Sequence, residues 1–194
     1  IPLSAEAVVE AVREDGIDLR LDDRQFPYVI EKDKLVFVGE GWKSRWWDAM
    51  EFDGATLRVV PGTGDHGCLG SGWGNYRAEE IEKGRIRLHH RFGRRPAPGN
   101  LLVLRHNERD HAGLFIVDSK EVTIENVQLH HSAGLGLLAQ YSENLTLRGY
   151  SAVPSPHRKV LSGHDDGVQV SNCRGLVRIE NCRLHGLMDD PINV

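Results

Sequence analysis

The amino-acid sequence predicts an all-β protein whose first half is antiparallel and whose second half winds as a parallel β-helix. Three observations predict this fold class. The second half repeats with an offset of 23 residues, seen between Val122 and Leu145. The first half consists of short segments in which apolar and polar residues alternate, separated by Gly, Pro and Asp. The chain also contains 21 glycines in 194 residues, which indicates frequent turns.

The first half is expected to form antiparallel hairpins. Its strand-like segments are "GIDLRL", "KLVFVGE", "ATLRVVPG", "YRAEEI" and "RIRLHH", and "EKG" between the last two predicts a hairpin turn. The segment "SAEAVVEAVREDG" fits a helix capped by Ser4 and ended by Gly16, but it fits a strand equally well. We favour the strand.

The stretch "RPAPGN" at residues 95–100 is the expected boundary between the halves, because turn-forming residues cluster there. This boundary gives an antiparallel β domain with its lead-in strand at 1–97 and β-helix coils at 98–194. The chain opens on Ile1 and closes on Val194 within strand-like sequence, so we expect it to be a piece of a longer chain.

The repeat in the second half becomes visible when three segments are written beneath one another. These are "SKEVTIENVQLHHSAGLGLLA", "SENLTLRGYSAV" and "CRGLVRIENCRLHGLMDDPINV". Val122, Leu145 and Val177 then occupy equivalent positions, and "PSPHRKVLS" supplies the nine extra residues of the second step. Coils of a β-helix lie about 4.8 Å apart, so we expect these three residues to stack in its interior.

Two pairs of adjacent acids follow the same repeat. Asp165 and Asp166 are offset by 24 residues from Asp189 and Asp190, which stacks the pairs on neighbouring coils. Carboxylates held this close raise one another's pKa. A trio of Asp166, Asp189 and Asp190 could therefore supply the acid and the base of glycosidic bond hydrolysis. A ladder of turn-capping Asp side chains or a calcium site would explain the same spacing.

Composition excludes several functions. The net charge of −4 gives no basic excess for binding nucleic acid, and no apolar run approaches the length of a membrane span. The three cysteines have no CxxC spacing, which argues against zinc. The basic stretch at 85–95 is expected to be a solvated hairpin face or a contact for an anionic glycan. The tryptophans of "GEGWKSRWWDAM" fit either core packing or sugar stacking.

The motif "GHDDGVQVSNCRGLVRIENCRLHGLMDDPINV" resembles glycoside hydrolase family 110, the bacterial α-1,3-galactosidases that act on blood-group-B type glycans. "FPYVIEKDKLVFVGEGW", "NLLVLRHNERDHAGLFI" and "GLGLLAQYSENLTL" also resemble segments of that family, so the similarity runs from about Gly16 to the end. The resemblance implies a parallel β-helix with an inserted β-barrel-like domain. It also implies a secreted or periplasmic location.

The same resemblance implies an exo-acting, inverting enzyme that needs no cofactor or metal. Its catalytic carboxylates would be Asp166, Asp189 and Asp190, with Asp189 as the general acid and the other two holding and deprotonating the water. We expect Asp165, Arg109 and Asn193 to contribute to substrate binding. The expected partner is a galactose-terminated glycan, and a homo-oligomer is possible.

Two other functions fit the sequence. One is a different β-helix enzyme acting on carbohydrates, such as a polygalacturonase-like hydrolase or a lyase. A lyase would need calcium and a basic residue near the acids, and the aligned repeats offer no such residue. The other is a non-catalytic glycan-binding β-helix in which the acidic pairs serve only as structure.

Overall fold

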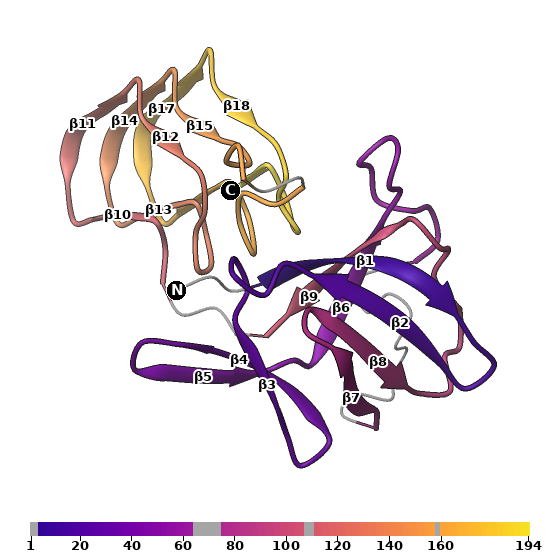
Figure 1. Ribbon diagram of the computed structural model, residues 1–194. Helices are drawn as coiled ribbons and strands as arrows, with labels where there is room; N and C mark the ends of the chain where they lie inside the picture. The colour runs from indigo at the N-terminus through magenta and orange to yellow at the C-terminus, as the bar shows by residue number, and fades with distance from the viewer. Residues whose placement is uncertain (1–3, 64–74, 107–110, 158–159) are drawn as a thin grey trace. The chain divides into compact units, whose positions relative to one another are not determined.

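The computed structural model describes residues 4–63, 75–106, 111–157 and 160–194 (Figure 1). The chain divides into two compact units, 1–107 and 108–194, which we call the hairpin unit and the coil unit. All regular elements within the described ranges are strands, as the sequence predicted. Those ranges include no helix with the length and hydropathy needed to cross a membrane.

The hairpin unit is antiparallel. Its strands are β1 (Ser4–Val12), β2 (Gly16–Leu21), β3 (Tyr28–Glu31), β4 (Lys34–Gly39), β5 (Trp42–Arg45), β6 (Asp48–Phe52), β7 (Arg77–Glu82), β8 (Arg85–His89) and β9 (Leu101–Arg105). Six of them form a sheet in the order β6-β9-β1-β2-β8-β7, and β3, β4 and β5 form a second sheet. The ambiguous N-terminal segment is the strand β1, in which Ala5, Ala7 and Val9 point alternately into the core.

Trp42 and Trp46 pack in the core of the hairpin unit. Trp46 is 1% exposed, and its Nε1 donates a hydrogen bond to the Asp48 carbonyl at 2.6 Å. Trp42 packs against the same core and stacks on His106 with ring centroids 5.7 Å apart. Core packing, rather than sugar stacking, is therefore the role of these two rings.

The boundary between the units lies between 107 and 108, later than the expected boundary at 97/98. The reason is that β9 pairs antiparallel with both β1 and β6. Leu102, Val103 and Leu104 of this strand are all fully buried, so β9 lies inside the hairpin unit. The stretch "RPAPGN" is a turn within that unit, where the Gly99 amide donates to the Val9 carbonyl at 2.8 Å.

The basic stretch of the hairpin unit is engaged in internal ion pairs. Asp18 is fully buried and accepts hydrogen bonds from Arg87 Nε at 2.7 Å and Arg13 Nη2 at 2.8 Å. The hydrogen bond from Arg87 lowers the pKa of Asp18 well below its ordinary value, against the opposing effect of burial. Arg85 in turn pairs with Glu10 at 2.8 Å.

The coil unit passes through three parallel sheets in turn (Figure 1). Its strands are β10 (Leu114–Val117), β11 (Lys120–Glu125), β12 (Gln128–Leu129), β13 (Leu137–Gln140), β14 (Glu143–Arg148), β15 (Ser151–Ala152), β16 (Val168–Ser171), β17 (Arg174–Glu180), β18 (Arg183–Leu184) and β19 (Ile192–Asn193). The sheets have the orders β10-β13-β16-β19, β11-β14-β17 and β12-β15-β18. Each pass through the sheets is one coil.

The register within these sheets is the one the repeat predicted. Val122 pairs with Leu145, which pairs with Val177; Leu145 is buried in the core of the unit, and the two valines are partly buried and pack against it. Tyr150, Leu137 and other apolar residues complete this core.

The corners between sheets need backbone angles in the left-handed region. Gly186 adopts positive φ at one corner, and the other described residues of the coil unit with positive φ form three columns: Asp118, Tyr141 and Asn172; Glu121, Asn144 and Gly175; Asn126, Gly149 and Asn181. Asn and Gly adopt this conformation at low energetic cost. Asn126 and Asn181 therefore belong to a turn ladder. A Cβ added at Gly149 would lie 2.6 Å from Asn126 Oδ1, so this corner also needs the absence of a side chain.

Candidate active site

The first pair of acids precedes β16 and the second pair precedes β19. The Gly136 amide donates to the Asp166 carbonyl at 2.8 Å, and the Gly167 amide donates to the Asp190 carbonyl at 2.9 Å. These bonds place Asp166 and Asp190 at equivalent positions of adjacent coils. One carboxylate oxygen from each of Asp166, Asp189 and Asp190 lies within 4.8 Å of the others. The structure thus brings together the three acids that the sequence singled out.

The three acids differ in their surroundings. Asp166 is only 4% exposed, whereas Asp189 and Asp190 are exposed. Asp166 Oδ1 accepts a hydrogen bond from the Asp190 amide at 3.2 Å, and its Oδ2 accepts one from Asn193 Nδ2 at 3.1 Å. The same Asp190 amide lies 3.1 Å from Asp189 Oδ1. A single backbone N–H therefore orients two of the three carboxylates.

Burial raises the pKa of Asp166 above its ordinary value, and the negative charges of Asp189 and Asp190 add to this effect. The hydrogen bonds from Asn193 and from the Asp190 amide act in the opposite direction. A carboxylate with a raised pKa is a stronger base once it is ionised. A carboxyl group with a raised pKa also keeps its proton to a higher pH, so Asp166 could exchange a proton with a substrate or a water.

The three residues expected to bind substrate do not all lie at the acidic trio. Asn193 lies at the site, where its amide holds Asp166. Asp165 is 1% exposed, with its Oδ1 3.1 Å from His164 Nδ1, so it is buried against its neighbour in the chain. Arg109 lies outside the described residues. Sequence reasoning missed His164, which is 5% exposed and stands directly before the first acidic pair.

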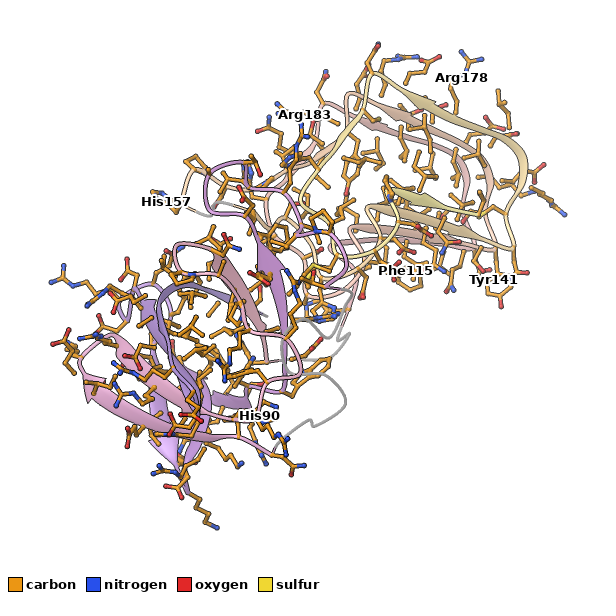
Figure 2. The ribbon with its side chains drawn as sticks, turned by 90° about the vertical axis from the view of Figure 1, so that its right-hand side faces the viewer. His90, Phe115, Tyr141, His157, Arg178 and Arg183 are labelled. Carbon is orange, nitrogen blue, oxygen red and sulfur yellow. The ribbon has the colours of Figure 1, made fainter. Side chains whose placement is uncertain are left out.

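Sequence reasoning also missed the surface that adjoins the acids. Phe115, Leu138, Gln169 and Asn193 occupy equivalent positions on successive strands, β10 to β19. Their neighbours Ile116, Leu137 and Val168 point into the core, so this column faces outward. Phe115 is 57% exposed (Figure 2). A saccharide bound at the acids would find amide groups and then an apolar surface along this column.

The trio could also bind a cation. Among the described residues it is the one cluster of three or more acidic, His or Cys side chains that brings its ligand atoms together. Calcium takes six to eight oxygen ligands, so three carboxylates would supply part of its coordination shell. The donor set fits a hard cation such as calcium better than zinc, which prefers nitrogen and sulfur ligands.

Residues 5–102 match the family described as GLAA-B beta-barrel domain I. The chain is 48% identical to alpha-1,3-galactosidase B of Bacteroides thetaiotaomicron, over 100% of this chain and 32% of the relative. It is 34% identical to alpha-1,3-galactosidase A of Bacteroides fragilis, over 93% of this chain and 29% of the relative. It is 31% identical to alpha-1,3-galactosidase B of Akkermansia muciniphila, over 97% of this chain and 23% of the relative. The chain spans about a third or less of the length of these relatives.

Proposed function

Because the chain belongs to glycoside hydrolase family 110, we propose that it carries the catalytic acids of an exo-acting, inverting α-galactosidase. The substrate would be a glycan that ends in α-1,3-linked galactose, the linkage named for the relatives. The observation that carries this proposal is the convergence of three carboxylates within 4.8 Å, one of them buried. Hydrolysis of a glycosidic bond needs an acid and a base of this kind.

The architecture we propose for the whole protein follows from the same comparison. The three parallel sheets that the coil unit visits in turn support a parallel β-helix. The six-stranded antiparallel sheet and the match to a β-barrel domain support a barrel-like insertion. A polymeric or surface-bound glycan is met outside the cytoplasm, so we also propose a secreted or periplasmic location.

The three acids would divide the chemistry according to their surroundings. Asp189 is exposed and would protonate the departing glycosidic oxygen as the general acid. Asp166 would take a proton from the attacking water, because burial and neighbouring charge raise its pKa and two hydrogen bonds hold its carboxylate in place. Asp190 would hold that water together with Asp166, one coil away. Asn193 fixes the orientation of Asp166.

The spacing of the acids bears on the stereochemistry. Carboxyl groups of inverting enzymes are usually about 6.5–9.5 Å apart, and those of retaining enzymes about 5–5.5 Å. The closest oxygens of the trio lie within 4.8 Å, nearer to the retaining range. Inversion is therefore proposed from the family resemblance, and the anomer of the product separates it from retention.

The test of the proposed activity is the release of galactose from an α-1,3-linked galactobiose by the full-length protein. We expect hydrolysis by the wild type and a loss of at least a hundredfold in kcat/KM for each of the Asn variants of Asp166, Asp189 and Asp190. Absence of hydrolysis by the folded wild type would refute the α-1,3-galactosidase proposal.

A calcium-dependent carbohydrate enzyme is the second candidate, and the convergence of three carboxylates favours it. The two candidates differ in their response to a chelator. Galactose release by an acid–base hydrolase should persist in excess EDTA, whereas a calcium-dependent enzyme should lose its activity and regain it when calcium is restored.

A further inference from the structure

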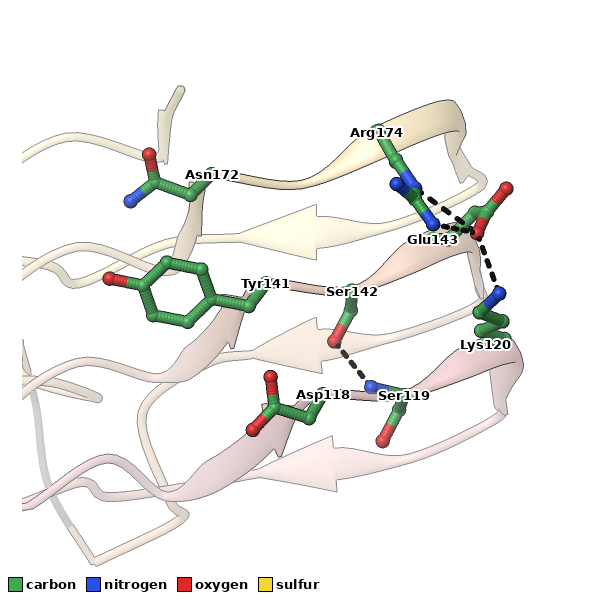
Figure 3. A pocket seen from close by; sticks show the side chains of 8 residues that line it. All are labelled: Asp118, Ser119, Lys120, Tyr141, Ser142, Glu143, Asn172 and Arg174. Carbon is green, nitrogen blue, oxygen red and sulfur yellow. Dashed lines mark hydrogen bonds and ion pairs between the residues drawn. The ribbon is translucent and has the colours of Figure 1, made fainter.

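The coil unit has a cavity at the end of its β10-β13-β16 strands that lies opposite to the acidic trio. Asp166 precedes β16, whereas this cavity of about 340 Å³ lies where β10, β13 and β16 end (Figure 3). Its lining consists of Asp118, Ser119, Lys120, Tyr141, Ser142, Glu143, Asn172 and Arg174. None of these residues belongs to the acidic trio.

Tyr141 occupies a backbone position that is unfavourable for a bulky residue. Its φ is 49°, in the left-handed region, and its column neighbours Asp118 and Asn172 have φ of 47° and 53°. Asp and Asn tolerate this region, whereas a tyrosine there costs on the order of 1–2 kcal/mol. Tyr141 is also 61% exposed, so its ring gains little from burial. Folding alone therefore does not explain an aromatic ring at this corner.

The polar side chains that line the pocket form two groups, one beside the Tyr141 ring and one on the other side of the pocket (Figure 3). Figure 3 shows Asp118, Tyr141 and Asn172 pointing outward from consecutive coils, with the ring between the carboxylate and the amide. Glu143 Oε2 accepts hydrogen bonds or ion pairs from Arg174 at 3.0 Å and Lys120 at 3.3 Å. The hydrogen bond from Arg174, followed by that from Lys120, lowers the pKa of Glu143.

The formal charges in this pocket cancel. Asp118 and Glu143 are acids, and Lys120 and Arg174 are bases, so the lining is neutral overall. An exposed aromatic face flanked by a carboxylate and an amide suits a ligand with an apolar ring face and hydroxyl groups on its rim. Such a ligand is a neutral sugar.

We propose that this pocket is a second, non-catalytic saccharide site in which a pyranose ring stacks on Tyr141. Asp118 and Asn172 lie one coil to either side, about 4.8 Å away, and hydrogen-bond the hydroxyls of that ring. The site goes beyond the proposed hydrolysis and rests on it only for the class of ligand. It would hold a neutral glycan chain on the coil unit while the acids act on a galactose elsewhere.

Native affinity electrophoresis of the full-length protein tests this site. The gel contains galactomannan, a neutral polysaccharide with α-galactose branches, and every variant carries Asp189→Asn to stop hydrolysis. We expect the galactomannan to retard the protein. Tyr141→Phe should keep this retardation because it keeps the ring, and Tyr141→Asn should weaken the affinity about tenfold. Asn adopts the left-handed conformation readily, so Tyr141→Asn should also melt at or above the temperature of its parent.

The matched control is Leu176→Ala, which removes another exposed apolar side chain of the coil unit outside the pocket. It should be retarded like its parent. Equal retardation of Tyr141→Asn and its parent would overturn the proposal. So would the absence of any retardation, or retardation only by an anionic polysaccharide such as polygalacturonate. The gel measures binding without turnover, so an inactive wild type would count against the proposed hydrolysis and leave this result independent.

Discussion

Single residues in the acidic trio are distinguished by burial and by one shared amide. Asp166 is almost fully buried and receives two hydrogen bonds, whereas Asp189 and Asp190 are exposed. An exposed acid can follow a departing oxygen, and a buried, oriented acid is better placed to hold a water molecule. The division of roles proposed for the reaction follows from this contrast.

Substrates with different leaving groups test that division. Asp189→Asn should reduce kcat/KM strongly, by about a thousandfold, on a disaccharide whose leaving group needs a proton. Its loss on an activated aryl α-galactoside should be much smaller, about tenfold, because that leaving group departs without help. Asp166→Asn should impair both substrates to a similar degree. The opposite pattern, with leaving-group dependence in Asp166→Asn, would contradict the assignment.

The raised pKa of Asp166 also has a consequence for stability. The folded state binds the proton of Asp166 more tightly than the unfolded state, so wild-type stability is lost as the pH rises from about 4 through the folded-state pKa. Asp166→Asn removes this buried charge and should raise the free energy of unfolding at about pH 7, on the order of 1 kcal/mol. Chemical denaturation at several pH values measures the difference. A gain that does not shrink towards about pH 4 would show that burial of the charge is not its cause.

At the scale of elements, the sequence predicted the strand pairings and contacts that follow from the repeated pattern of residues. The repeat predicted the pairing of Val122, Leu145 and Val177, because equal phase in successive coils means contact. The offset between the acidic pairs predicted the trio for the same reason. The boundary at 97/98 was wrong because turn residues such as "RPAPGN" also connect strands within one unit. The pairing of β9 with β1 joins segments far apart in sequence, and no local pattern records it.

The burial of a side chain is likewise a property of the assembled coils. Asp165 and Asp166 are adjacent and chemically identical, and both are buried, yet one faces His164 and the other faces Asn193. Sequence cannot distinguish these environments, because the facing residues come from the turn around Asp165 in one case and from the next coil in the other.

The coil core provides a prediction about stability. Leu147 is 2% exposed and pairs in register with Ile124 and Ile179. Leu147→Asp would bury an unpaired charge at a cost of several kcal/mol, so the coil unit should unfold. Thr146→Asp is the matched control, because the adjacent side chain points to the other face of the strand. Circular dichroism should show loss of strand signal and cooperativity in the first variant and near-native melting in the second.

The ion pairs of the hairpin unit provide a second prediction about stability. Asp18→Asn leaves Arg87 and Arg13 without their buried partner, which should lower the free energy of unfolding by about 2–3 kcal/mol at about pH 7. The effect is below that of a fully buried pair because the arginine side chains are 25% and 44% exposed. Since the folded pKa is lowered, this stabilisation is complete above about pH 4 and is lost as the pH falls below it. Urea titrations should therefore give a smaller difference between wild type and variant at about pH 3; an unchanged difference would rule out the charge as the source.

At the scale of the whole molecule, the two units have separate cores, and the coil unit carries the acids of the proposed active site. The core of the hairpin unit gathers Trp46, Phe37 and the apolar residues of β1, β2 and β9. The core of the coil unit lies beneath the column that ends at Asn193. The described acids of the proposed active site all belong to the coil unit, so the rigidity of its stacked strands is what fixes their spacing.

The stereochemistry of the product tests the reaction as a whole, since it depends on where the water, the sugar and all three acids lie together. We expect proton NMR of a digest by the full-length protein to show β-galactose first, because a water held by Asp166 and Asp190 attacks opposite the departing oxygen. The substrate is α-1,3-galactobiose as its methyl β-glycoside, so that the leaving sugar has no free anomeric centre. The α anomer should appear only later, at the rate of spontaneous mutarotation measured with free galactose as the control. Initial release of α-galactose would mean that one carboxylate attacks the sugar directly, which the closeness of the three acids would permit. In that case the water-holding role of Asp166 and Asp190 would be wrong, and a covalent galactosyl-enzyme should be trapped by a slow fluorinated substrate.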